Sequence, residues 1–191
     1  METGDQALED AAAAFARSAV GGGLSPEVDA LIAEAGRLRH RPEEALALLK
    51  RARSEAPSHP APLVALYRFY FYGHQLALAR AVGEDALAIA RTALGPAFGD
   101  EPPSRDAARY DAAVRFYLFT LKGLAYLNLR LGELEEARLL LRELRRLDPE
   151  DQVGGALLSQ VLANRVQYME AGDDLGAQAA YPARGWTGAQ P

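Results

Sequence analysis

The sequence predicts an all-α protein whose helices pair into hairpins and stack on one another. Ala and Leu dominate the 191 residues, and both are strong helix formers. Helix start and stop signals divide most of the chain into segments of 12–16 residues joined by short turns. A pattern of apolar and small residues also recurs every 34 residues. Such a period is typical of stacked helical hairpins.

The composition argues against several classes of protein. The chain has no Cys, which excludes disulfides, thiolate metal sites and Cys nucleophiles, and its three His are scattered. The formal net charge is −5, which does not favour nucleic acid as a partner. Acids near the N-terminus do not fit a signal peptide, and no apolar run is long enough to span a membrane. We expect a soluble, cytoplasmic protein with neither a nucleic acid nor a membrane as partner.

The N-terminal region is predicted to be an arm. Residues 4–20 could form an Ala-rich helix, but Gly21-Gly22-Gly23 then breaks it. We therefore expect residues 1–24 to be flexible or loosely attached. A folded domain is predicted over residues 25–169, beginning with Ser25 as an N-cap and Pro26 at the first helical position.

Within the domain, Pro and Gly mark the ends of further helices. The longest internal loop is Gly95–Ser104, and the 27 residues from Arg105 to Leu131 lack Pro and predict one long helix. Residues 170–191 lack apolar periodicity and predict a flexible tail, in which Tyr181 and Trp186 are a possible anchor. The remaining helices are expected at about 26–38, 42–56, 60–72, 75–94, 133–147 and 152–169.

The repeated pattern defines three units and an insertion. The units cover about 26–59, 60–93 and 118–151, and an extension over 94–117 separates the second from the third. The third unit has a Leu-plus-small pair, a Gly at the turn and a terminal Pro, at Leu124-Ala125, Gly132 and Pro149. Small residues are expected where helices cross closely, at Ala33, Ala45, Ala79, Ala125 and Ala137.

These units resemble the tetratricopeptide repeat family. The resemblance covers about residues 26–165 and implies a right-handed solenoid of about three hairpins, capped by the helix over 152–169. The second unit departs from the family pattern, with Tyr67 in place of a small residue, Gly83 in place of a large one and Arg91 in place of Pro. An irregular helical bundle is the alternative.

No motif for catalysis stands out. The sequence has no nucleophile elbow, zinc-protease motif, dinucleotide fingerprint or phosphate loop. Its carboxylate groups lie at helix ends, where acids cap helices or offset the helix dipole, and His40, His59 and His74 lie at turns. We expect a protein that is not an enzyme, with no catalytic residues, no metal site and no cofactor.

Ten of the fifteen aromatic residues fall in the first helices of the second and third units. In the tetratricopeptide family, one face of these first helices lines a concave groove that binds proteins. The first unit would contribute the more polar residues Glu27, Ala30, Glu34 and Arg37. The partner-binding residues expected from the other units are Val64, Arg68, Phe71, Tyr72, Phe119, Lys122, Tyr126, Leu129 and Arg130.

These aromatic residues could instead pack in the core, and we favour the core for Phe69 and Tyr117. If they line a groove, rings and arginines together are typical of a protein interface. The sequence therefore favours a non-enzymatic adaptor or assembly chaperone for one protein client or peptide.

Two narrower resemblances concern the client. Phe69–Ala81 and Arg115–Gly132 look similar to small tetratricopeptide proteins found with nitrogen-fixation genes, which implies an accessory role in nitrogenase maturation or protection. The size, helical content and acidity also resemble the small chaperones of type III secretion. The alternative from another class is an enzyme or small-ligand-binding protein with a site at the 95–104 loop and the groove. The client and the oligomeric state stay open.

Overall fold

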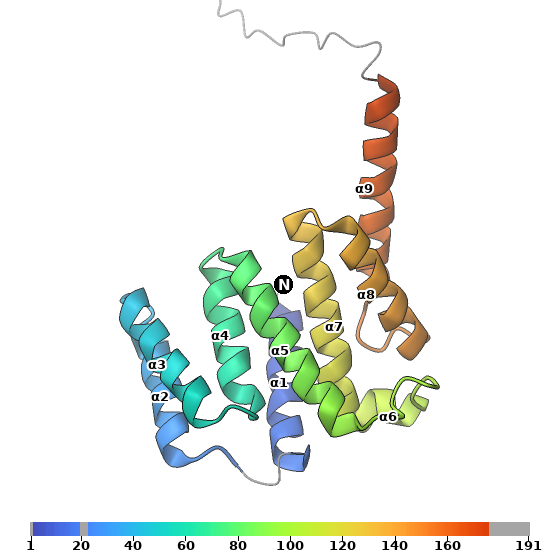
Figure 1. Ribbon diagram of the computed structural model, residues 1–191. Coiled ribbons are helices and arrows are strands. Elements are labelled where there is room, and N and C mark those ends of the chain that lie inside the picture. Colours follow the sequence, from blue (N-terminus) through green and yellow to red (C-terminus); the bar gives the residue numbers. More distant parts are fainter. Residues whose placement is uncertain (1, 20–22, 176–191) are drawn as a thin grey trace, which may run out of the picture.

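The computed structural model describes residues 2–19 and 23–175, and this part of the chain is all-α (Figure 1). Apart from one isolated bridge between Phe98 and Glu101, these residues form no β-structure. In chain order the helices are α1 (Glu2–Ala19), α2 (Pro26–Arg37), α3 (Pro42–Glu55), α4 (Pro60–Tyr72), α5 (Leu76–Leu94), α6 (Arg105–Tyr110), α7 (Ala112–Leu131), α8 (Leu134–Leu147) and α9 (Ala156–Leu175).

Successive helices form hairpins that lie side by side. The pairs α2–α3, α4–α5 and α7–α8 correspond to the three predicted units, except that α7 begins at Ala112, inside the predicted extension over 94–117, and α5 ends one residue late at Leu94. Each hairpin packs against the next (Figure 1). Helix α2 begins where expected, because the Ser25 hydroxyl accepts a hydrogen bond from the Val28 amide at 3.3 Å. Proline opens α2, α3 and α4, where its missing N–H costs nothing.

The expected long helix over Arg105–Leu131 is wrong. The chain breaks at Asp111, whose extended backbone (φ −74°, ψ 122°) separates α6 from α7. Its carboxylate accepts hydrogen bonds from the amides of Ala113 and Val114 at 2.9 and 3.0 Å. An acid with this capping geometry starts a helix rather than continuing one.

The expectation of a loosely attached arm is also wrong for the described part of residues 1–24. Helix α1 packs along both α4 and α7, on the side away from α5 (Figure 1). Its residues Ala11, Ala12, Phe15 and Ala16 are buried, and the ring of Phe15 stacks on Phe116 with centroids 5.1 Å apart. These residues follow the spacing of an amphipathic helix, so their apolar face makes α1 part of the core. The glycines that follow α1 in the sequence do not prevent this packing.

Close helix crossings occur at four of the five expected small residues. Ala45, Ala79, Ala125 and Ala137 are at most 1% exposed. Ala33 is exposed, because it lies on α2 at the open edge of the stack, where only Val28 and Ala35 are buried.

The two departures in the second unit compensate each other. A Cβ added to Gly83 would lie 2.8 Å from Leu124 Cδ2 and 3.8 Å from Tyr67 Cδ2. Leu124 therefore fills most of the space that the missing side chain of Gly83 leaves, and the large Tyr67 packs beside it at van der Waals distance. Gly123 also stands close to Tyr67, since a Cβ there would lie 3.2 Å from the tyrosine oxygen. The unit keeps close packing by exchanging volume between two positions.

The turn after α8 is held by two acids. The Asp148 carboxylate accepts from the amides of Gln152 and Val153, both at 2.9 Å. Asp151 accepts from the amides of Gly155 and Ala156 at the start of α9, so this acid serves as a cap, whereas Asp148 holds the turn itself. Helix α9 then runs to Leu175, into the predicted tail. Residues 176–191, with Tyr181 and Trp186, lie outside the described residues.

Candidate functional site

An open groove lies between α1, α2, α3 and α4. Its volume is about 990 Å³. The lining residues are Glu9, Ala12, Ala13, Ile32, Ala35, Gly36, Arg39, Pro42, Leu49, Ala61, Val64, Ala65, Arg68, Phe69, Tyr72, Gly73 and Gln75. Three of them, Val64, Arg68 and Tyr72, were expected to line a partner-binding groove.

The floor of this groove is apolar and its rim is polar. Ala35, Leu49 and Val64 are buried at its base. Tyr72 is 54% exposed and projects at the end of α4. Arg39 is exposed, and no residue that the structure describes holds its guanidinium. An apolar floor with an exposed aromatic residue and an arginine at the rim is the composition of a protein-binding surface.

Helix α1 forms one wall of the groove. Arg68 Nη1 lies 2.5 Å from Glu9 Oε2, and both side chains remain partly exposed. Below this pair, α1 covers the surfaces of α4 and α7 so closely that the space left among Leu8, Leu63 and Phe116 is about 10 Å³. That volume is about the minimum for one water molecule. Helix α1 of the same chain therefore fills the space between α4 and α7.

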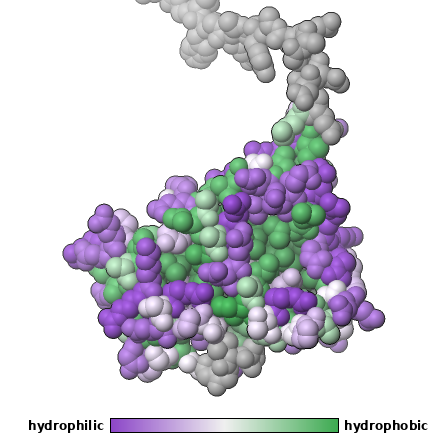
Figure 2. Space-filling model, viewed as in Figure 1, coloured by the Kyte–Doolittle hydropathy of each residue, from purple (hydrophilic) through white to green (hydrophobic). Residues whose placement is uncertain are grey.

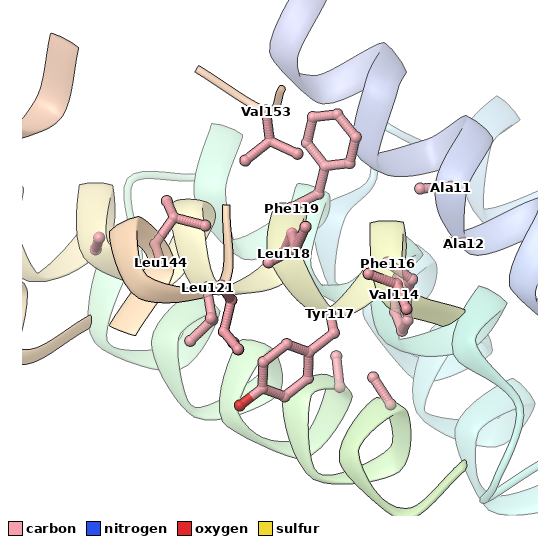
Figure 3. Packing of buried hydrophobic residues seen from close by; sticks show 14 of the residues in the cluster. Ala11, Ala12, Val114, Phe116, Tyr117, Leu118, Phe119, Leu121, Leu144 and Val153 are labelled. Atoms are coloured by element: carbon pink, nitrogen blue, oxygen red, sulfur yellow. The ribbon is translucent and has the colours of Figure 1, made fainter. Parts of the chain in front are cut away.

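The residues expected from α7 have a different environment from those of α4. Phe119 and Leu129 are 8% and 3% exposed, and Arg115 lies over the Phe119 ring with its Cζ 5.2 Å from the centroid. The Lys122 ammonium donates to the backbone oxygen of Val153 at 2.7 Å. Phe119 and Tyr117 leave α7 on opposite sides, and Phe119 lies beside Val153 in the core cluster (Figure 3).

Three of the expected binding residues are core residues that do not line the groove. Phe71, Phe119 and Leu129 are at most 9% exposed, and Phe71 packs between Tyr67 and Tyr126 with centroids 5.9 and 6.0 Å away. Tyr126 is half-buried, and its hydroxyl accepts from Arg130 at 2.9 Å. Of the two alternatives left open for the aromatic helices, the core holds for much of α7, because α1 and the α8–α9 turn cover it.

A comparison with known proteins places the chain in a family. A protein of Azotobacter chroococcum mcd 1, described as an uncharacterized 19.8 kDa protein in the nifW 5′ region, is 38% identical over 127 residues. The match spans 60% of this chain and 67% of that protein. This chain belongs to the same family. No protein-family profile and no solved structure matches the chain, so membership of the tetratricopeptide repeat family stays a prediction from the 34-residue spacing.

The described part of this chain shows no cluster of metal-ligating side chains. Among residues 2–19 and 23–175, no group of three His, Asp or Glu is arranged to hold a metal ion. None of the described helices is long and apolar enough to cross a membrane. Burial raises the pKa of Tyr117, which packs edge-on against Phe98 with centroids 5.1 Å apart.

His59 has a structural position at the start of α4. Its Nδ1 accepts from the Ala61 amide at 3.2 Å, so the imidazole serves as an N-cap. The residue is 8% exposed, its Nε2 has no hydrogen-bond partner, and burial lowers its pKa. Because Nδ1 accepts, the neutral imidazole carries its proton on Nε2, which leaves a buried N–H donor without a partner.

The 95–104 loop, the alternative location of a site, is tied to its neighbours. Arg91 donates to the Gly95 oxygen at 3.1 Å, and its guanidinium lies 5.5 Å from the centroid of Phe98. Arg146 of α8 donates to the Gly99 oxygen at 2.7 Å. These contacts attach the loop to α5, α7 and α8, so the loop has a structural role.

Sequence reasoning missed the residues that α1, α2 and the exposed part of α4 contribute to the groove. Ile32, Ala35 and Arg39 face it, rather than the predicted Glu27, Ala30, Glu34 and Arg37. Phe69, for which we favoured the core, is only half-buried and lines the groove. A usable signal was present in α1, where Leu8, Ala11, Ala12 and Phe15 follow the helical spacing of a core-facing stripe.

Proposed function

We propose that this protein is a non-enzymatic protein-interaction module that serves as an accessory factor in nitrogen fixation, and that it binds a client protein in the groove between α1, α2, α3 and α4. The client would be a protein of nitrogenase maturation or protection. Its binding segment would place apolar side chains on the groove floor and acidic groups near the rim.

The observation that carries the binding proposal is the contrast between floor and rim. The floor residues Ala35, Leu49 and Val64 present apolar surface, while Tyr72 and Arg39 stand exposed above it. Aromatic residues and arginines are enriched among the residues that dominate binding energy. An exposed tyrosine also contributes to an interface without a large loss of side-chain entropy.

The link to nitrogen fixation is supported by the related Azotobacter protein, whose name places it in the nifW 5′ region. The aromatic-rich segments Phe69–Ala81 and Arg115–Gly132 also resemble small helical-repeat proteins found with nitrogen-fixation genes. Both points concern the client's biological setting rather than the chemistry of the groove.

The proposal can be tested by affinity capture from an extract of nitrogen-fixing cells, with quantitative mass spectrometry. We expect the wild-type protein to retain a client encoded with the nitrogen-fixation genes. Tyr72→Ala should weaken the interaction about 30-fold, which corresponds to about 2 kcal/mol at a hot spot. Arg39→Glu should slow association and alter its salt dependence.

The control variant is Tyr110→Ala. Tyr110 is 69% exposed on α6, outside the groove, so its removal changes a similar side chain at a different surface. Equal capture of the client by wild type, Tyr72→Ala and Arg39→Glu would show that the groove is not the binding site. Failure of the wild-type protein to enrich any nitrogen-fixation protein would contradict the proposed setting.

A further inference from the structure

A second groove lies at the other end of the stack, between α8 and α9. Its volume is about 610 Å³. Leu141 and Leu162 form a buried apolar base, and Val166 is half-buried beside them. Helix α9 extends past α8 at one end of this hairpin (Figure 1). This surface shares no lining residue with the groove of the proposed function.

One wall of this groove carries a stripe of positive charge. Arg138, Arg142 and Arg145 follow each other at spacings of four and three residues along α8, so they share one face of the helix. Arg138 reaches Glu135 at 3.5 Å, whereas no side chain that the structure describes, in residues 7–17 and 23–169, pairs with Arg142 or Arg145. Hydrophilic side chains cover the α8 side of the molecule in the view of Figure 2.

The described side chains of the opposite wall do not neutralise this charge. From Ala156 to Met169, α9 has no Asp or Glu, and its one charged residue, Arg165, donates to the Leu129 oxygen. The groove is therefore a locally basic site on a chain of net charge −5. A partner with carboxylates along one edge would meet unpaired guanidinium groups, which bind carboxylates strongly.

The arrangement of the stack indicates the shape of that partner. The first helices α2, α4 and α7 are each followed by a second helix that packs beside them, namely α3, α5 and α8. In the described part of the chain, no second helix follows α9. The place beside α8 and α9 thus has the apolar base that another helix would cover.

A second copy of this chain does not fit the groove by the same face. A two-fold contact through α8 would bring Arg138, Arg142 and Arg145 against their own equivalents, and the like charges would repel. The charge pattern selects an acidic partner instead.

We propose that the groove between α8 and α9 docks an amphipathic α-helix of another protein, with an apolar stripe flanked by carboxylates three or four residues apart. The apolar stripe packs on Leu141, Leu162 and Val166. The carboxylates pair with Arg142 and Arg145, which fixes the direction and register of the helix.

The test uses two fluorescent, helix-stabilised synthetic peptides of about four turns, roughly 15 residues. Both carry the same leucine stripe, and one has glutamates on its flank where the other has lysines. Fluorescence anisotropy with the full chain should show saturable binding of the glutamate peptide and at least about tenfold weaker binding of the lysine peptide. Arg142→Glu and Arg145→Glu should each weaken binding of the glutamate peptide about tenfold or more.

Two further variants control for charge and for shape. Arg51→Glu makes the same charge change at an exposed site on α3 and should leave binding unchanged. Ala163→Trp fills the groove at an exposed position without changing its charge, and it should block the glutamate peptide. Tyr72→Ala should have no effect, so failure here and failure of the proposed function are distinguishable.

Equal binding of both peptides, or full binding of the glutamate peptide by Arg142→Glu and Arg145→Glu, would overturn the proposal. A single-stranded oligouridylate that binds with the same dependence on Arg142 and Arg145, while the glutamate peptide does not bind, would also overturn it. That result would identify a site for anionic polymers rather than for a helix.

Discussion

Helices α4 and α7 occupy equivalent places in the second and third units, yet their surfaces differ. On α4, Tyr72 is exposed and Arg68 is half-buried at the wall of an open groove. On α7, Phe119 and Leu129 are buried. Both helices are covered in part by α1, but the α8–α9 turn covers only α7, through Lys122 and Val153. The position of a residue in a repeat therefore does not determine its exposure, because elements outside the repeats decide which surfaces remain open.

The largest expected effect concerns the contact that closes the surface between α4 and α7. Phe15→Ala removes a ring that is fully buried and stacked on Phe116. We expect a loss of about 3–5 kcal/mol in the free energy of unfolding, measured by chemical denaturation. Phe116→Ala should behave alike. A change within about 0.5 kcal/mol for Phe15→Ala would mean that α1 is not docked and that α7 is as open as α4.

A second prediction concerns the exchange of volume between Tyr67 and Gly83. Gly83→Leu should destabilise the protein by about 1–3 kcal/mol, because even a Cβ would come 2.8 Å from Leu124 Cδ2. Tyr67→Ala opens space beside it. We expect the double variant to lose less free energy of unfolding than the sum of the two single variants, by about 0.5–3 kcal/mol. Strict additivity would show that the two departures are unrelated.

A third prediction concerns pH. Burial lowers the pKa of His59 below its ordinary value of 6.5, so below that pH the unfolded chain binds more protons than the folded one. The free energy of unfolding should therefore fall as the pH decreases through about 6.5 and on toward the lowered pKa. His59→Asn keeps a side-chain acceptor for the cap but cannot titrate, and its stability should depend less on pH. Identical pH profiles for wild type and variant would contradict this reading.

The smallest expected effects are at the open groove. Glu9 and Arg68 are partly exposed, so Glu9→Gln should change the free energy of unfolding by less than about 1 kcal/mol. Tyr72→Ala should also have a small effect, since the side chain is 54% exposed. Denaturation midpoints for these variants, set beside that of Phe15→Ala, measure the difference between α4 and α7 directly. A large loss for Tyr72→Ala would place its ring in the core.

Local signals in the sequence predicted the helices well, and the contacts between distant elements poorly. Ser25 and Pro26 mark the start of α2, and Ala125 and Ala137 are buried as the spacing predicted. The break at Asp111 was missed because no Pro or Gly marks it. The glycines after α1 led to the prediction of a loosely attached arm. That prediction is wrong because Phe15 packs in the core.

The candidate site was predicted only in part, for the same reason. Val64, Arg68 and Tyr72 line the groove as expected, because their faces follow from the helical period of α4. The burial of Phe119 and the half-burial of Lys122 depend on Val153 and on α1, which lie far from them in sequence. The periodicity of apolar residues within α7 does not predict contacts with elements that are distant in sequence.

The most direct test of the central claim is site-specific photocrosslinking in an extract of nitrogen-fixing cells. The chain has no Cys, so a cysteine introduced at residue 72 or 110 can alone carry a benzophenone probe. The account predicts that the probe at residue 72 links to one nitrogen-fixation protein and that the probe at residue 110 does not. Equal adducts from both positions, or none at residue 72 while that protein still co-purifies, would contradict the claim that the groove beside α4 is the binding site.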